Sequence, residues 1–214
     1  MKISWSADYV GRHLLHAAPH DYDGVPPISA LLIDERPKVL SPDREAVAGA
    51  LVFGRYAAGT FEFPRKFSPA VASAIEVYCG GSWVSPGPIE YYPKALPEGS
   101  RRAVLQSGGS LDRLASGPDG AVNFSVLRSD TYSGALLSLG AFAIASNAWL
   151  HGELGGGLER LTVPLAVGVL FAEDLLIDEF FLPATVGWST EEESAIRRLL
   201  GACRLGLVIG GQQA

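Results

Sequence analysis

The sequence predicts an α/β fold, with a mixed and mostly buried β-sheet and helices packed on both of its faces. Helix-start signals of the Ser-Pro type alternate along the chain with short runs of branched apolar residues. Several of those runs show no polar alternation, as is expected of strands that are covered on both faces. We therefore expect a single α/β domain that spans residues 1–214.

Three helices are predicted from their N-terminal residues. Ser-Pro pairs open the segments 41–56 and 68–79, and each pair places a side-chain acceptor at the N-cap and a proline at the first helical position. A third helix begins at Ser189, because Glu192 three residues later completes a capping box. The residues that we expect this C-terminal helix to bury lie on one face: Ile196, Leu199, Leu200 and Cys203.

Six apolar runs are predicted strands: 28–33, 83–92, 102–106, 122–127, 165–171 and 205–209. The segment between residues 131 and 151 carries no Asp, Glu, Lys or Arg. Its serines and glycines make it too polar for a membrane span, so we expect a helix over 133–150 through the centre of the domain. Asn147 and His151 share one face of that helix, and a buried polar pair requires hydrogen-bond partners from the protein or from a ligand.

The composition excludes several classes of partner. The formal net charge is −6, and the basic residues are scattered along the sequence rather than clustered. A protein that binds a nucleic-acid backbone or an anionic membrane needs a basic patch, so we expect neither partner. The two cysteines lie far apart, and the first residues lack the basic and apolar regions of a signal peptide. These features favour the cytoplasm and reduced thiols.

Three of the four histidines fall within eight residues, at His13, His16 and His20. If residues 8–17 form a helix, the first two lie one turn apart on one face, and Asp21 adds a carboxylate. Such a set could hold zinc or another divalent metal with an open position for water. The pair of His20 and Asp21 resembles the doublet of HD-type metal-dependent phosphohydrolases, whose further ligands lie on later helices, where this sequence offers one distant histidine. In the alternative interpretation, the histidines complement the negative end of a helix dipole.

A glycine turn, Ser107-Gly108-Gly109-Ser110, directly follows a predicted strand. Its backbone N–H groups could cradle a phosphate. The run resembles the Ser-Gly-Gly-x-Asp-Ser pyrophosphate loop of ATP-pyrophosphatases, which implies a nucleotide ligand and adenylation of a carbonyl oxygen. Here one extra residue precedes the acidic position, and an arginine replaces the closing serine. A loop between two strands accounts for the same residues without a ligand.

Polar residues follow another predicted strand at Arg128, Ser129 and Asp130. Open α/β sheets bind ligands at the carboxyl ends of their strands, so these side chains could orient a substrate. Ser129 or Asp130 could equally cap the helix that we expect to follow. Two acidic pairs, at residues 173–174 and 178–179, are also open to two interpretations, as metal or acid–base groups or as solvated turn residues.

These observations favour a cytosolic protein that binds a small polar, nucleotide-like ligand at the carboxyl ends of strands, as a degenerate ATP-pyrophosphatase-like or biosynthetic accessory enzyme. The contacts would come from residues 107–110 and 128–130, together with Asn147 and His151. One alternative is a metal-dependent hydrolase that uses the histidine cluster. Another is a non-catalytic subunit whose apolar surface is buried in a homo-oligomer, which a hydrophobic content of 48% permits. The sequence does not decide whether the protein is an enzyme.

Overall fold

The computed structural model describes residues 1–81, 83–107, 120–155, 157–182 and 187–210. Within these residues, eleven strands form one mixed sheet that packs with five α-helices, which confirms the predicted α/β class. In chain order the elements are β1 (Lys2–Ala7), β2 (His13–Ala18), β3 (Ala30–Ile33), α1 (Pro42–Phe53), η1 (Gly54–Tyr56), β4 (Gly59–Phe67), α2 (Pro69–Tyr78), β5 (Val84–Ile89), β6 (Arg101–Ser107), β7 (Val122–Arg128), β8 (Ala135–Leu137), β9 (Ala141–Ser146), α3 (Ala148–Gly155), α4 (Glu159–Phe171), β10 (Ile177–Leu182), α5 (Thr190–Ala202) and β11 (Gly206–Ile209).

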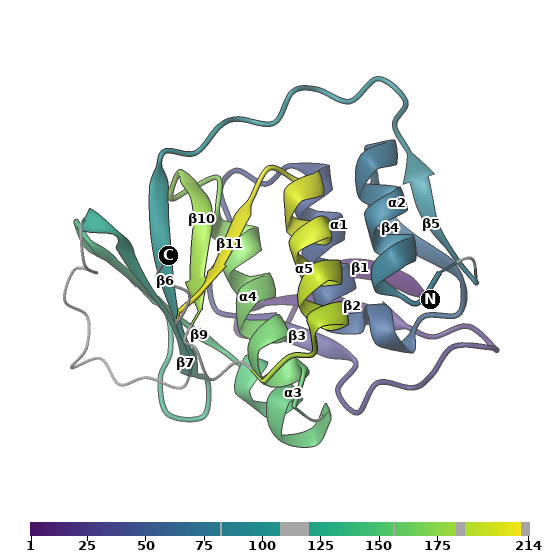
Figure 1. Cartoon of the computed structure of the whole chain (residues 1–214). Coiled ribbons are helices and arrows are strands. Elements are labelled where there is room, and N and C mark those ends of the chain that lie inside the picture. Colours follow the sequence, from purple (N-terminus) through teal and green to yellow (C-terminus); the bar gives the residue numbers. More distant parts are fainter. Residues whose placement is uncertain (82, 108–119, 156, 183–186, 211–214) are drawn as a thin grey trace.

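The sheet consists of two parallel groups that are joined by antiparallel strands. Its order is β11-β10-β6-β7-β9-β3-β2-β1-β4-β5, with β8 paired to β9 outside this path. Neighbours run parallel from β11 to β9 and again from β1 to β5. Between the groups, β9, β3, β2 and β1 pair antiparallel. Figure 1 shows the strands arranged around α1, α2, α4 and α5, which pack side by side and bury the core between themselves and the sheet.

The three predicted helix starts are confirmed. The hydroxyls of Ser41 and Ser68 each accept a hydrogen bond from the backbone N–H three residues later, at 3.3 Å. At the start of α5 both halves of the capping box form: the Ser189 N–H donates to the Glu192 carboxylate at 2.8 Å, and the Glu192 N–H donates to the Ser189 hydroxyl at 3.2 Å. The expected stripe is fully buried, at Ile196, Leu199, Leu200 and Cys203.

The predicted strand at 165–171 is wrong, because these residues form the second half of α4. Its residues are buried on every side, and complete burial removes polar alternation from a helix just as it does from a strand covered on both faces. Gly168 lets the helix approach the sheet closely, since a Cβ at this position would lie 2.8 Å from the ring of Phe180 on β10. The other five predicted strands correspond to β3, β5, β6, β7 and β11.

The predicted central helix over 133–150 is also wrong. A hairpin of β8 and β9 occupies most of this segment, and α3 begins only at Ala148. The expected burial is present in β9, where every residue is buried. Phe142 and Ile144 point into the main core, and small alanines alternate with them. This period of two is the pattern of a strand, and the absence of charge obscured it.

Residues 8–17 do not form the helix that the histidine spacing required. The chain instead makes a hairpin in which β1 and β2 pair from Lys2↔Ala18 to Ala7↔His13. Asp8 closes the turn by accepting hydrogen bonds from the backbone N–H groups of Val10 and Arg12. In the part of the chain that the structure describes, no helix has the length and apolar character needed to cross a membrane.

We predict that Leu199→Ala lowers the free energy of unfolding by about 2–5 kcal/mol, because the Leu199 side chain is 0% exposed in the core. Urea unfolding monitored by circular dichroism measures this change. The neighbouring Arg198, which is exposed on the same helix, supplies the control Arg198→Ala, for which we expect a change within about 0.5 kcal/mol. Equal stability of the two variants would contradict the buried position of Leu199.

Candidate functional site

A cavity of about 620 Å³ lies at the carboxyl ends of the parallel strands β4 and β5. Its cover is the connection from β5 to β6, which runs over the top of the helices in Figure 1. We call residues 90–97 the strap, and the space beneath them the strap cavity. The lining residues come from the α1 N-terminus, β4, the strap and the end of α4: Val39, Leu40, Ser41, Pro42, Asp43, Lys66, Phe67, Glu90, Tyr92, Pro93, Lys94, Ala95, Leu96, Pro97 and Glu173.

Glu173, in the cavity lining, and Arg44, its buried neighbour outside that lining, form no side-chain hydrogen bond with the described residues. Arg44, in the first turn of α1, is 1% exposed, and the side chain of Glu173, just after α4, is 4% exposed. Their nearest charged atoms, Arg44 Nη1 and Glu173 Oε1, stand 3.8 Å apart, which is an ion pair but too long for a hydrogen bond. Among the described residues, Arg44 Nε, Arg44 Nη2 and Glu173 Oε1 find no hydrogen-bond partner.

The unpaired atoms of Arg44 have a specific geometry. Nε–H and the neighbouring Nη2–H point in parallel, and this edge of a guanidinium binds carboxylates or phosphates through two hydrogen bonds. A buried donor or acceptor left without a partner costs about 1–3 kcal/mol, and more when it is charged. The lining of the strap cavity therefore includes one carboxylate oxygen without a hydrogen bond, Glu173 Oε1, and the unpaired donors of Arg44 lie next to that carboxylate, outside the lining.

The adjacent buried carboxylate, Glu45, is fully used by the protein. The indole N–H of Trp5 donates to it at 2.6 Å, and the guanidinium of Arg65 donates at 2.7 Å. Asp43 is also engaged, because it accepts the backbone N–H of Ser68 at 2.7 Å. The first turn of α1 thus carries three buried charges, and only Arg44 lacks a matching hydrogen bond.

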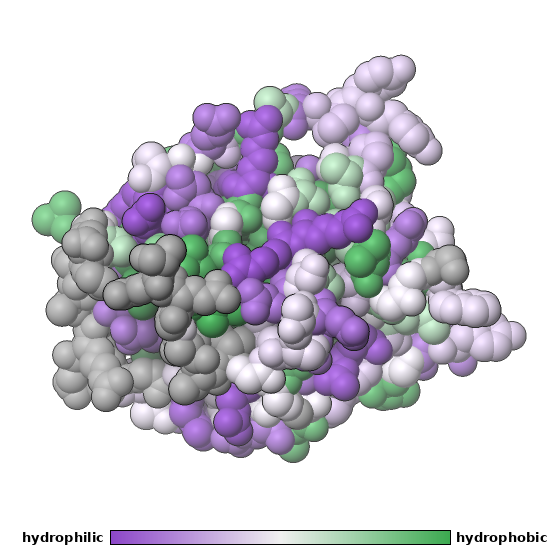
Figure 2. Space-filling view, viewed as in Figure 1, coloured by the Kyte–Doolittle hydropathy of each residue, from purple (hydrophilic) through white to green (hydrophobic). Residues whose placement is uncertain are grey.

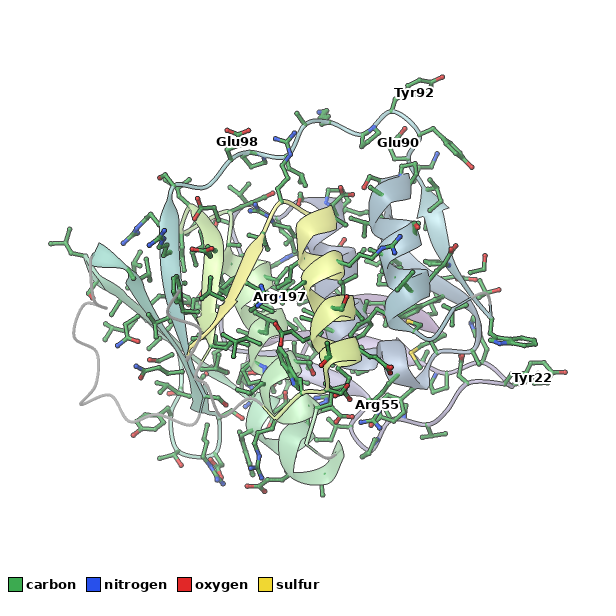
Figure 3. The ribbon with its side chains drawn as sticks, in the orientation of Figure 1. Tyr22, Arg55, Glu90, Tyr92, Glu98 and Arg197 are labelled. Atoms are coloured by element: carbon green, nitrogen blue, oxygen red, sulfur yellow. The ribbon has the colours of Figure 1, made fainter. Side chains whose placement is uncertain are left out.

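The strap itself is held by few contacts. Arg204, just after α5, donates to the carbonyl of Leu96 at 3.4 Å and to the carboxylate of Glu98 at 3.3 Å. Tyr92 is 91% exposed and points away from the body of the molecule, as Figure 3 shows. The backbone of the strap and the side chain of Leu96 therefore provide the cover.

The two cysteines are unsuited to nucleophilic chemistry. Both are free thiols, and burial raises the pKa of Cys79 to about 12 and that of Cys203 to about 12. A thiol with such a pKa is almost entirely protonated near neutral pH, and the thiolate is the reactive form. Cys203 donates its S–H to the carbonyl of Leu200 in the core.

The structure does not bring the histidine cluster together. His13 and His16 both lie on β2, and residues three apart in a strand point to opposite faces. His20 and the exposed Asp21 follow the strand. Within the described ranges, no group of three or more His, Cys, Asp or Glu side chains is placed to hold a metal ion.

His20 takes part in a different arrangement. Its Nδ1 lies 3.0 Å from the ammonium of Met1, which also donates to the carbonyl of Thr60 at 2.6 Å and forms an ion pair with Asp23 at 2.5 Å. Burial raises the pKa of Asp23, but hydrogen bonds from this ammonium and from the N–H groups of Ala58 and His20 outweigh it and hold the pKa below its usual range. These contacts fix the loop after β2 to the start of β4.

Arg128 and Asp130 bind each other after β7. The Arg128 guanidinium donates two hydrogen bonds to the Asp130 carboxylate, at 3.1 and 2.8 Å, and it stacks 3.8 Å from the ring centroid of Trp149. The backbone N–H of Ser129 donates to Ser146. The helix that Ser129 or Asp130 was expected to cap is absent, since β8 follows.

Asn147 and His151 find their partners in the protein backbone. The Asn147 amide accepts from the N–H of Leu32 at 2.8 Å and donates to the carbonyl of Ala30 at 2.9 Å. His151 Nε2 lies 3.2 Å from the same carbonyl. Burial lowers the pKa of His151, and the hydrogen bond with Ala30 only partly offsets this effect. Both side chains bind β3 to the segment that follows β9.

Ser107 ends β6 and is exposed, whereas Gly108, Gly109 and Ser110 lie outside the described residues. Of the acidic pairs, Asp174 accepts the N–H groups of Lys38 and Val39 at 2.7 and 2.8 Å and fixes one wall of the strap cavity. Glu179 forms an ion pair with Arg102 at 3.2 Å.

Sequence reasoning singled out Glu173 only as part of an acidic pair and missed Arg44. The sequence does contain a signal that Arg44 is buried and needs a partner. The charged run Asp43-Arg44-Glu45 precedes the apolar stretch 46–53 in one helix. A helix that is apolar all round is buried, so its charged first turn must be buried with it and must pair.

We predict that His151→Gln removes part of the acid sensitivity of the fold. Because the folded state lowers the pKa of His151, its contribution to stability is present above the unfolded pKa of about 6.5 and is lost as the pH falls below it. Urea unfolding between pH 7.5 and 5 measures the effect. Ser6→Gln, at an exposed position of β1 that carries no titratable group, is the control that should keep the wild-type pH profile. Identical profiles for wild type and His151→Gln would contradict a buried neutral imidazole.

Comparisons of the chain with protein-family models, with curated protein sequences and with solved structures find no match.

Proposed function

We propose that this protein binds a small molecule with an apolar body and polar end groups in the strap cavity. The observation that carries the proposal is the cavity of about 620 Å³ whose lining includes the buried Glu173, with its Oε1 lacking a hydrogen-bond partner among the described residues. Ligand sites are typically concave, mostly apolar spaces of roughly 300–1,000 Å³ with a few placed polar groups. The strap cavity has this size and this composition.

The position of the cavity also supports a ligand site. It lies beyond the carboxyl ends of β4 and β5, where Phe67 ends one strand and Glu90 follows the other. The N–H of Glu90 donates to the carbonyl of Phe67 at 2.7 Å, which closes the parallel pair beneath the cavity. Ligands of parallel sheets bind at this end of the strands. The sequence also predicts a ligand site at the carboxyl ends of strands, but after β6 and β7, whereas the proposed site follows β4 and β5.

The apolar walls come from rigid elements. Leu40 and Phe67 belong to the loop before α1 and to β4, and both pack on the main core. Side chains that are held by the core keep their positions when a ligand binds. The proposed function is binding. On the face in Figure 2, hydrophobic residues lie in separate patches among polar ones, and the exposed Leu136, Leu137 and Leu139 leave the homo-oligomer as an open alternative.

Titration with the uncharged fluorescent probe N-phenyl-1-naphthylamine, which emits in apolar surroundings, tests this proposal. We expect saturable binding of one probe molecule per chain. Ala95 lies on the strap in the cavity lining, so Ala95→Trp should fill the space and weaken binding about tenfold or more.

The matched control is Ala70→Trp, on the exposed side of α2 and outside the cavity lining, which should leave probe binding unchanged. Absence of saturable binding, or equal binding to wild type and Ala95→Trp, would refute the strap cavity as a ligand site.

A further inference from the structure

The charged side chains of the strap cavity are of both signs. Among its lining residues, three carry carboxylates and two carry ammonium groups: Asp43, Glu90 and Glu173, and Lys66 and Lys94. Arg44 does not line the cavity, but its guanidinium lies 3.8 Å from the Glu173 carboxylate. A site of this kind is electrically balanced, and its specificity depends on which of these groups are already bound by the protein.

Of the three carboxylates, Glu173 is the one whose side chain accepts no hydrogen bond from the described residues, and its charge is paired with Arg44 at 3.8 Å. Asp43 accepts the N–H of Ser68 at 2.7 Å, and Glu90 accepts the N–H of Tyr92 at 3.1 Å. Glu173 Oε1 has no hydrogen bond among the described residues, although only 4% of its side chain is exposed. A buried carboxylate in a cavity wall attracts a hydrogen-bond donor, and a protonated amine most strongly.

The ammonium groups, by contrast, are available. Lys66, next to the end of β4, and Lys94, on the strap, form no ion pair with any residue in the described part of the chain. They reach the cavity from two different elements. The N-terminus of α1, which lines the same space, adds the partial positive charge of a helix dipole. Together these groups favour an anionic group of a ligand.

A ligand with a single charge would meet like charges in this cavity. A simple cation would face Lys66 and Lys94, and a simple anion would face Glu173, Asp43 and Glu90. Unfavourable juxtaposition of like charges is how binding sites reject such ligands. A molecule that carries one charge of each sign satisfies both sets of groups.

We infer that the ligand of the strap cavity is a small zwitterion of the amino-acid type. Its amine pairs with Glu173, its carboxylate lies toward Lys66 and Lys94, and its apolar side chain contacts Leu40, Phe67 and Leu96. This inference rests on the proposed function, because it names the class of molecule that the strap cavity takes.

Three compounds with one indole body separate the contributions of the two charges. Tryptophan carries both the amine and the carboxylate, tryptamine only the amine, and indole-3-propionate only the carboxylate. Isothermal titration calorimetry with the full chain measures the dissociation constant of each. We expect tryptophan to bind about tenfold or more tightly than either of the other two.

Two variants assign each charge to its partner. Glu173→Gln should weaken tryptophan and tryptamine about tenfold and leave indole-3-propionate within about twofold. Lys66→Met should weaken tryptophan and indole-3-propionate and leave tryptamine unchanged. The controls are Glu76→Gln on α2 and Lys2→Met on β1, which are exposed and outside the cavity lining. Because Lys66 is exposed, its variant keeps the test decisive even if Glu173→Gln fails to fold.

The outcomes distinguish this inference from the proposed function. Equal binding of the three compounds, or preference for a singly charged one, overturns the zwitterion. Failure of all three to bind, with fluorescent-probe binding that Ala95→Trp abolishes, overturns the zwitterion and retains the strap cavity as a ligand site. Failure of all three compounds and of the probe overturns both.

Discussion

The joint between β9 and β3 is the interaction on which the continuity of the sheet depends. The strands share one paired position, Ile33↔Ser146. Side chains extend this short backbone ladder: the Ser146 hydroxyl donates to the carbonyl of Leu32 at 2.7 Å, and the Asn147 amide bonds both Leu32 and Ala30. An amide side chain offers a donor and an acceptor side by side, so it can satisfy an exposed strand edge as another strand would. This joint holds the β11-to-β9 group against the rest of the sheet.

The helical layer reinforces the same joint from inside the sheet. α1 follows β3 and packs along α4, which precedes β10, so the two helices link the two parallel groups. The charged first turn of α1 lies at the end of this contact, where Arg44 meets Glu173 of the segment after α4. The lining of the strap cavity therefore combines Asp43 of α1 with Glu173, which follows α4, so both helices are needed to form the cavity.

Local signals in the sequence predicted what local forces decide. Ser41, Ser68 and Ser189 start helices because each hydroxyl satisfies an N–H group of its own helix, and no distant residue is needed. The predictions from long apolar runs were wrong in both ways: the predicted strand at 165–171 is helical, and the centre of the predicted helix over 133–150 is extended. Complete burial removes the polar positions that reveal a period, so length and flanking glycines are the remaining guides.

The candidate site was predicted least well, for a physical reason. Arg44 and Glu173 are 129 positions apart in sequence, and only the packing of α1 on α4 places them together. Asn147 and His151 were recognised as buried polar residues, yet whether a backbone or a ligand satisfies them is decided by β3, which lies more than a hundred residues earlier. The sequence shows which buried polar side chains need hydrogen-bond or ion-pair partners, and the order in which the strands and helices pack decides which residues those partners are.

The loose attachment of the strap has a kinetic consequence. From Tyr91 to Glu98, a stretch that the structure describes in full, the chain forms neither helix nor strand, and Arg204 tethers it at Leu96 and Glu98. Displacing this stretch leaves every strand pairing intact, and opening of such a segment requires far less free energy than global unfolding. Molecules can therefore exchange with the interior through a local fluctuation, at a rate that is independent of how slowly the domain itself unfolds.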